Sequence, residues 1–147
     1  MTGQPRYFDD IDFGDELEPV EREIKTDQVV RFVNVWRTGG GGGDGRFTDP
    51  ERAKQMGLPG PIVPGAMIMG LFGQMLVEWA PNVTINKLDV VFRGNLLHNT
   101  PYKMAGIIVE KDERDGQNVL ECDVYVENEK QERPVTGKAT LSLPSRE

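Results

Sequence analysis

Residues 65–79 constrain the fold more than any other segment, because the stretch is apolar on all sides. Its apolar side chains are Ala66, Met67, Ile68, Met69, Leu71, Phe72, Met75, Leu76 and Val77. As a helix, the segment is about 22 Å long. A helix that is apolar all round must be buried on most of its sides. In a chain of 147 residues, which predicts a single domain, a curved sheet wrapped around this helix would bury it.

Four segments that follow this helix alternate apolar and polar residues, as antiparallel strands with one buried face do. They span residues 83–93, 102–109, 120–126 and 135–143. Asp115-Gly116 predicts a tight hairpin turn between the second and the third of them. A change of phase near Lys87 predicts a bulge in the first.

An edge strand and a helix are expected near the start of the chain. The strand covers residues 16–24 and is interrupted by Pro19, which suits a sheet edge. The helix begins at Thr26 or Asp27, and its apolar residues recur at spacings of three and four.

Asp49-Pro50 predicts the N-cap and first position of a short helix over residues 51–56, which ends at Gly57. The element order is therefore strand, helix, short helix, long helix and four antiparallel strands. This order predicts an α+β domain in which an antiparallel sheet wraps around a long central helix. Residues 1–147 are expected to form that one domain.

The composition excludes several classes of function. With 24 acidic and 17 basic residues the net charge is −7, which disfavours a nucleic-acid partner. One cysteine and one histidine exclude a Cys-rich or His-rich metal site, so no metal is expected. No basic segment followed by an apolar core opens the chain, and no apolar run reaches the ~20 residues of a bilayer span. We therefore expect a cytoplasmic protein without a membrane partner.

A family resemblance rests on residues 57–67, Gly-Leu-Pro-Gly-Pro-Ile-Val-Pro-Gly-Ala-Met, together with the strand pattern and the chain length. These features resemble the MaoC-like hydratases and dehydratases of the hotdog fold, a family that includes the R-specific enoyl-CoA hydratases. Phe13-Gly14-Asp15 is also similar to the family's opening. The resemblance, which runs from about Tyr7 to Leu143, implies a single MaoC-like hotdog domain. It also implies an acyl-CoA or acyl-carrier-protein thioester as ligand, no other cofactor, and subunits joined edge to edge as a homodimer or heteromer.

Active members of that family carry a loop of the form D-x-N-P-x-H-x-D and a later segment P-I-V-H-G. In the family, the loop's Asp and His activate a water for addition to an enoyl thioester, and the glycine amide at the helix start polarises the thioester carbonyl. Carried over residue by residue, the loop's Asp, Asn, Pro and His fall on Gly42, Asp44, Gly45 and Phe47, and the second His on Pro64. Only the final loop Asp, Asp49, and the helix-start glycine, Gly65, are retained. The acid–base dyad is missing.

Candidate site residues follow from this comparison. Asp44 and Asp49 are the candidate catalytic residues, as a displaced acid and base, although each is also explained as a solvated or capping carboxylate. Gly65, with Ala66 beside it, is the candidate thioester-binding site, and Arg46 is a candidate contact for a CoA phosphate.

Other residues are assigned structural roles. His98 is expected at the surface or at a subunit interface, and Cys122 as a small buried residue. Met67, Met69 and Met75 either line an acyl tunnel or belong to the core.

Three functions are compatible with the sequence. The preferred interpretation is an acyl-thioester-binding subunit that has lost its own dyad and pairs with a catalytic sibling. The second is an active enoyl-CoA hydratase or dehydratase that uses Asp44, Asp49 or a partner's residue. The third is a non-enzymatic ligand-binding or scaffolding domain. Whether the chain is itself an enzyme is left open by the sequence.

Overall fold

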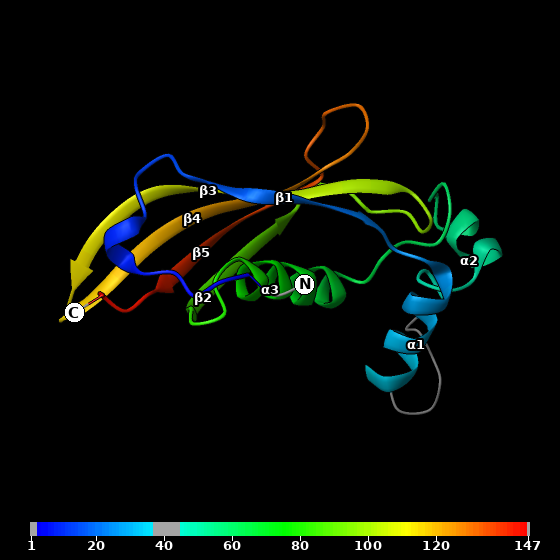
Figure 1. Ribbon diagram of the computed structural model, residues 1–147. Helices are drawn as coiled ribbons and strands as arrows, with labels where there is room; N and C mark the ends of the chain where they lie inside the picture. The colour runs from blue at the N-terminus through cyan, green and yellow to red at the C-terminus, as the bar shows by residue number, and fades with distance from the viewer. Residues whose placement is uncertain (1–2, 37–44, 147) are drawn as a thin grey trace.

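The computed structural model describes residues 3–36 and 45–146 of the chain (Figure 1). A short 3-10 helix, η1 (Phe8–Asp10), precedes the first strand. The helices are α1 (Thr26–Trp36), α2 (Pro50–Gln55) and α3 (Gly65–Trp79). The strands are β1 (Glu16–Glu23), β2 (Thr84–Phe92), β3 (Pro101–Arg114), β4 (Gln117–Glu127) and β5 (Val135–Ser142). The predicted order of strands and helices is confirmed.

The five strands form one antiparallel sheet in the order β1-β3-β4-β5-β2, so β1 and β2 are its edges. The sheet arches over α3, which lies along its concave face (Figure 1). The prediction of an antiparallel sheet wrapped around the long helix is therefore confirmed.

The predicted turn and bulge are both present. Asp115 and Gly116 have φ values of 52° and 78°, which is the left-handed backbone that a two-residue hairpin turn requires. The pairing of β2 with β5 shifts register between Ile85 and Lys87, at the predicted bulge. The hairpin is longer than predicted, because β3 continues to Arg114 past a register shift between Ile108 and Glu110.

A second bulge, which the sequence indicated only through Pro19, changes the phase of β1. Register with β3 shifts between Leu17 and Val20. Leu17 is buried, and after the shift Val20 packs against the core. Side chains alternate between the faces of a strand. The shift therefore brings Val20, Arg22 and Ile24 to the concave face.

Helix α3 is buried on the side that faces the sheet. Its buried residues are Ile68, Phe72, Met75, Leu76 and Trp79. On the opposite side Ala66, Gly70 and Gln74 are exposed, and Val77 is 43% exposed. We expected this apolar helix to be buried on most of its sides. Within a single chain, only the side that faces the sheet is buried.

The C-terminal end of α3 is closed by the first residues of the chain. The Gly3 amide donates to the Glu78 carbonyl at 2.7 Å, and Arg6 Nε donates to the Trp79 carbonyl at 2.6 Å. The Arg6 guanidinium also lies 5.1 Å from the centre of the Trp79 ring. A side chain at Gly3 would not fit, because its Cβ would lie 2.5 Å from the Glu78 oxygen.

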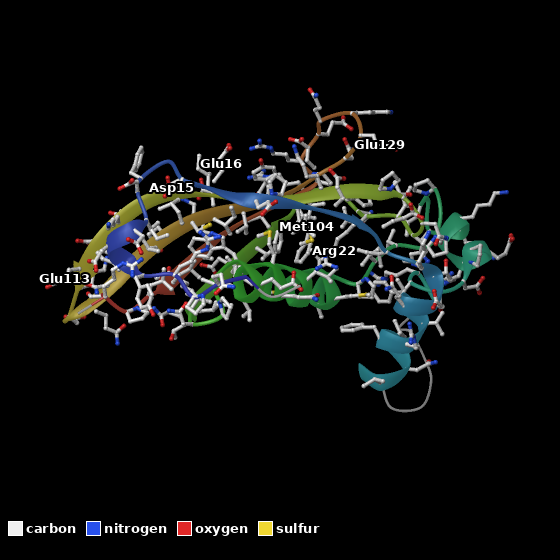
Figure 2. The ribbon with its side chains drawn as sticks, in the orientation of Figure 1. Asp15, Glu16, Arg22, Met104, Glu113 and Glu129 are labelled. Atoms are coloured by element: carbon white, nitrogen blue, oxygen red, sulfur yellow. The ribbon has the colours of Figure 1, made fainter. Side chains whose placement is uncertain are left out.

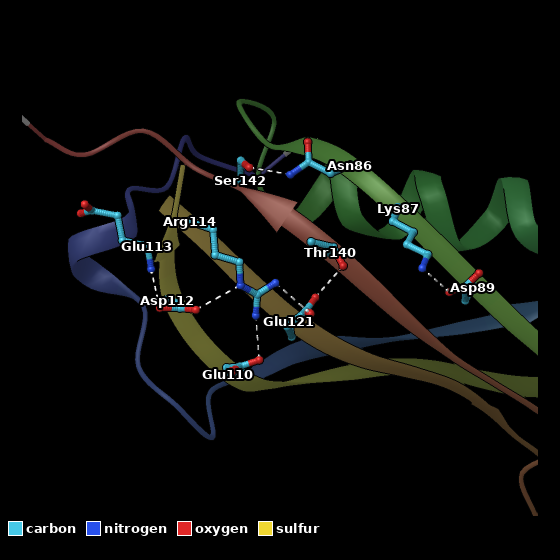
Figure 3. A network of polar contacts seen from close by, with 10 residues as sticks. All are labelled: Asn86, Lys87, Asp89, Glu110, Asp112, Glu113, Arg114, Glu121, Thr140 and Ser142. Carbon is cyan, nitrogen blue, oxygen red and sulfur yellow. Dashed lines mark hydrogen bonds and ion pairs between the residues drawn. The ribbon is translucent and has the colours of Figure 1, made fainter. Parts of the chain in front are cut away.

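A polar network covers the outer side of the β3–β4 hairpin (Figure 3). Arg114 forms ion pairs with Glu110, Asp112 and Glu121 at 2.9, 3.0 and 3.3 Å. The hydrogen bond from Arg114 lowers the pKa of Asp112 below its ordinary value, and the Glu113 amide adds to this effect. Thr140 donates to Glu121 from the neighbouring strand at 2.6 Å.

Candidate active site at the start of helix α3

Helix α3 begins with two backbone donors that nothing in the described part of the chain accepts from. Pro64 is the N-cap and offers no side-chain cap, while its carbonyl accepts from the Met67 and Ile68 amides at 3.1 and 3.2 Å. The Gly65 and Ala66 amides make no hydrogen bond among the described residues. The first amides of a helix carry partial positive charge, so this pair can bind an oxygen that carries negative charge.

Phe92, the last residue of β2, forms one wall of this helix start. A Cβ added to Gly65 would lie 3.0 Å from Phe92 Cζ and 3.3 Å from the adjacent ring carbons. The Phe92 ring is therefore in close contact with the glycine, and it is 46% exposed. Phe92 is not among the candidate site residues that the sequence predicted.

Residues 45–49, the described part of the loop on which the resemblance places the dyad, are hydrogen-bonded to the segment that precedes this helix. The Ile62 amide donates to the Arg46 carbonyl at 3.0 Å, which joins residues 45–49 to the segment that leads into α3. That segment is also held by the Val63 amide, which donates to the Leu96 carbonyl at 2.9 Å. Two stretches that are separate in sequence are thus brought to one place by backbone hydrogen bonds.

Of the two candidate catalytic carboxylates, Asp49 is among the described residues and its contacts are known. Asp49 is the N-cap of α2, as predicted, and its Oδ1 accepts from the Glu51 and Arg52 amides at 3.0 and 3.4 Å. Asp44 lies outside the described residues. A catalytic role for either residue stays a prediction.

Phe47 occupies the position where the resemblance places the catalytic histidine. It is partly buried and packs against the core. The Arg46 guanidinium lies 5.7 Å from the centre of the Phe47 ring, and the Arg46 side chain is exposed. A phenyl ring has no group that can donate or accept a proton, so Phe47 cannot act as the base that the resemblance implies at this position.

His98 is partly exposed, as a surface position requires, and its ring also makes two contacts within the chain. Its Nε2 lies 3.1 Å from the Ile62 carbonyl oxygen, and its Nδ1 lies 3.2 Å from Thr26 Oγ1. Because a carbonyl only accepts, Nε2 carries the proton and Nδ1 accepts from the threonine. His98 thus connects the β2–β3 loop to the start of α1 and to the segment before α3. It borders a cleft of about 370 Å³ that Thr48, Pro50 and Pro61 also line.

Cys122 is a buried core residue, as predicted. Burial raises the pKa of its thiol to about 12, which leaves it protonated at neutral pH and a poor nucleophile. Among the residues that the structure describes, no group of three or more His, Cys, Asp or Glu side chains could hold a metal ion. None of the described helices is long and apolar enough to cross a membrane.

Comparison with solved structures confirms the hotdog fold. The (R)-hydratase from A. caviae involved in PHA biosynthesis superimposes with a TM-score of 0.79, at 15% identity over 92% of this chain and 98% of that one. The MaoC-like dehydratase from Rhodospirillum rubrum gives a TM-score of 0.81, at 11% identity over 97% and 99% of the two chains. The HadBC (3R-hydroxyacyl-ACP dehydratase) complex from Mycobacterium tuberculosis gives 0.75, at 16% identity over 88% and 96%.

The resemblance noted in the sequence is confirmed by these structures at the level of the fold. The sequence matches no protein-family model, and no curated relative matches it.

Proposed function

We propose that the chain is a MaoC-like acyl-thioester-binding subunit of an enoyl-CoA hydratase or dehydratase, that it lacks its own catalytic dyad, and that it acts together with a catalytic sibling. One observation carries the proposal. The Gly65 and Ala66 amides at the start of α3 are without acceptors among the described residues, while Phe47 and Pro64 stand where the family carries histidines.

The proposed role of this chain is to hold and polarise the thioester carbonyl. An amide that donates to the carbonyl oxygen withdraws electron density from the conjugated double bond, and it stabilises the enolate oxygen that forms when water adds to the β-carbon. Pro64, which has no N–H, ensures that the first available donor is Gly65. The proton and the activated water are assigned to the sibling's Asp and His.

Arg46 is proposed to contact a CoA phosphate. Its side chain is exposed, and its backbone carbonyl is bonded to the segment that leads to Gly65. An exposed guanidinium suits a phosphate of the carrier better than the acyl group. Acyl-CoA is therefore preferred over an acyl-carrier protein as the first ligand to test.

A second subunit is proposed to cover the open side of α3 and the free edge of β2. Among the described strands, β2 is bonded only to β5, and Val91 near its end is 50% exposed. The open side of α3 presents Ala66, Gly70 and Val77, none of which the sheet of the same chain covers. A free strand edge beside an apolar helix face is what an edge-to-edge dimer buries. The HadBC structure is a complex of this fold, which supports a heteromer as one form of that dimer.

The test is hydration of crotonyl-CoA by the isolated full chain and by its complex with a catalytic MaoC-like sibling. The proposal expects no turnover by the isolated chain and turnover by the complex. Sustained turnover by the isolated chain would overturn it. If Asp44→Asn or Asp49→Asn then abolished that turnover, the chain would be an active hydratase with a rearranged acid and base. Failure to bind any acyl-CoA at millimolar concentration would indicate a scaffolding domain.

A further inference from the structure

Arg22 is a cation on the concave face of the sheet that has no partner in the described part of the chain. It lies on β1 opposite Tyr102, which is 6% exposed. Its Nε is buried and makes no hydrogen bond, and the guanidinium forms no ion pair with the described residues. A buried donor without an acceptor is costly to a folded protein. A ligand that accepts from this nitrogen would remove that cost.

The bulge at Pro19 is the reason that Arg22 reaches this face. Without the register shift, alternation from the buried Leu17 would turn Glu21 and Glu23 inward and Arg22 outward. With it, Arg22 lies between β1 and α3 (Figure 2). Glu23 is instead paired with Lys25, and both side chains are largely exposed.

Arg22 borders a cavity of about 180 Å³ between β1, the start of α1 and α3. Ile24, Met67 and Leu71 give this cavity apolar walls, and Gln28 adds a side-chain amide. The Gln28 Oε1 atom accepts from the Lys25 amide at 2.8 Å, so its NH2 group is the part left to donate. Glu21 and Glu23 also border the cavity. Alternation along β1 turns the Glu21 and Glu23 side chains to the face opposite Arg22, so the unused groups that Arg22 and Gln28 present to the cavity are donors.

The cavity lies along the same helix as the thioester site. Met67 and Leu71 follow Gly65 by two and six residues, which is about 3 and 9 Å along the helix axis. An acyl group whose carbonyl oxygen accepts from the Gly65 amide would reach this cavity with a few carbon atoms. The apolar walls suit the methylene groups, and the two donors suit a planar anion at the end of the chain.

We propose that this cavity binds the distal carboxylate of a short dicarboxylic acyl thioester, with Arg22 and Gln28 as its ligands. The inference rests on the proposed function and deepens it by naming the class of acyl group. A carboxylate matches the planar guanidinium and the small apolar cavity, whereas a CoA diphosphate is larger and remains hydrated.

The test compares succinyl-CoA with butyryl-CoA, which differ in a terminal carboxylate or methyl group on the same four-carbon chain. Isothermal titration of the isolated full chain should show succinyl-CoA binding at least about tenfold more tightly, because hydrogen bonds to a charged group are strong. Arg22→Gln should remove that preference and leave butyryl-CoA binding unchanged. Arg31→Gln, at an exposed arginine of α1 that pairs with Asp27, is the matched control and should keep the preference.

A stability measurement separates ligand binding from a structural role. Because Arg22 has no partner among the described residues, Arg22→Gln should not lower the midpoint of thermal unfolding. Equal binding of the two thioesters by the native chain would overturn the inference alone. The same holds if Arg22→Gln weakens both thioesters equally, which would assign Arg22 to CoA or to folding. Failure of both thioesters to bind would overturn the proposed function and this inference with it.

Discussion

The two ends of α3 differ in whether the rest of the chain forms hydrogen bonds with their backbone groups. At the C-terminal end, Gly3 and Arg6 donate to the carbonyls of Glu78 and Trp79. At the N-terminal end, the Gly65 and Ala66 amides have no acceptor among the described residues. Both ends of a helix leave backbone groups unpaired, and folding alone favours closing both. The closed end contributes to stability, and the open end is where we propose that the thioester carbonyl binds.

Filling the open end should have the largest effect. Gly65→Val places a branched side chain against the Phe92 ring, where even a Cβ would lie 3.0 Å from Cζ. Displacement of the ring and shielding of the amides should weaken binding of crotonyl-CoA about 100-fold. Calorimetric titration measures this loss. Gly60→Val is the matched control, since a Cβ there meets no heavy atom within 4 Å. Unchanged binding by Gly65→Val would show that the open end is not the ligand site.

Charging the open side of α3 should have the next largest effect. Val77→Glu puts a carboxylate on the surface that a second subunit is proposed to cover, and the dimer should dissociate at least about tenfold more readily. Sedimentation velocity over a dilution series measures the dissociation constant. Val35→Glu, at a residue of α1 that is 87% exposed, is the control. If both variants associate like the native chain, the open side is not the interface.

Opening the closed end should cost stability but leave binding unaffected. Arg6→Ala removes the hydrogen bond to the Trp79 carbonyl and the contact with the Trp79 ring. The free energy of unfolding should fall by about 1 kcal/mol, as measured by urea denaturation. Crotonyl-CoA binding should not change, because Arg6 lies at the opposite end of the helix from Gly65. A loss of binding without a loss of stability would contradict the assignment of the two ends.

The smallest expected effect is a loss of folding stability at acidic pH. Hydrogen bonds from Lys103 and then Arg133 lower the pKa of Glu127, and Lys103 and Arg133 lie 3.1 and 3.3 Å from its carboxylate. Because the pKa of Glu127 is lower in the folded state than in the unfolded chain, its ion pairs with Lys103 and Arg133 stabilise the fold at pH values above the ordinary pKa of Glu. This stabilisation is lost as pH falls below about 4.3 toward the folded value.

This acid dependence is measured by urea denaturation at a series of pH values. Glu127→Gln should flatten the fall in stability below that pH. Glu129→Gln, at an exposed position on the β4–β5 loop, should not. If the free energy of unfolding depended on pH in the same way for both variants, the ion pairs of Glu127 would not contribute to stability in solution.

Much of the fold was predictable because it depends on local signals. Alternation defined the strands, Asp115-Gly116 the hairpin, and Asp49-Pro50 the cap and first turn of α2. The closure of α3 was not predictable, because Gly3 and Arg6 reach it across more than 70 residues of sequence. Tertiary contacts of this kind leave no periodic pattern.

The site was predictable only in part. The Pro64-Gly65 pair indicated the helix start, and the resemblance implied that Phe47 stands at the position of the family's catalytic histidine, which stays a prediction. The positions of Arg22 and His98 depend on a register shift in β1 and on a loop that folds back within the same chain. Pro19 was the one available signal for the first of these. It marked an edge strand, but it did not show which side chains the bulge would turn inward.

The most direct test of the central claim is one titration of the isolated full chain with crotonyl-CoA, in which the heat of binding and the ultraviolet absorbance of the enoyl thioester are recorded together. We expect saturable binding that Gly65→Val weakens about 100-fold, with no loss of the enoyl absorbance. Hydration of the thioester by the isolated chain, or the absence of any binding, would contradict the central claim.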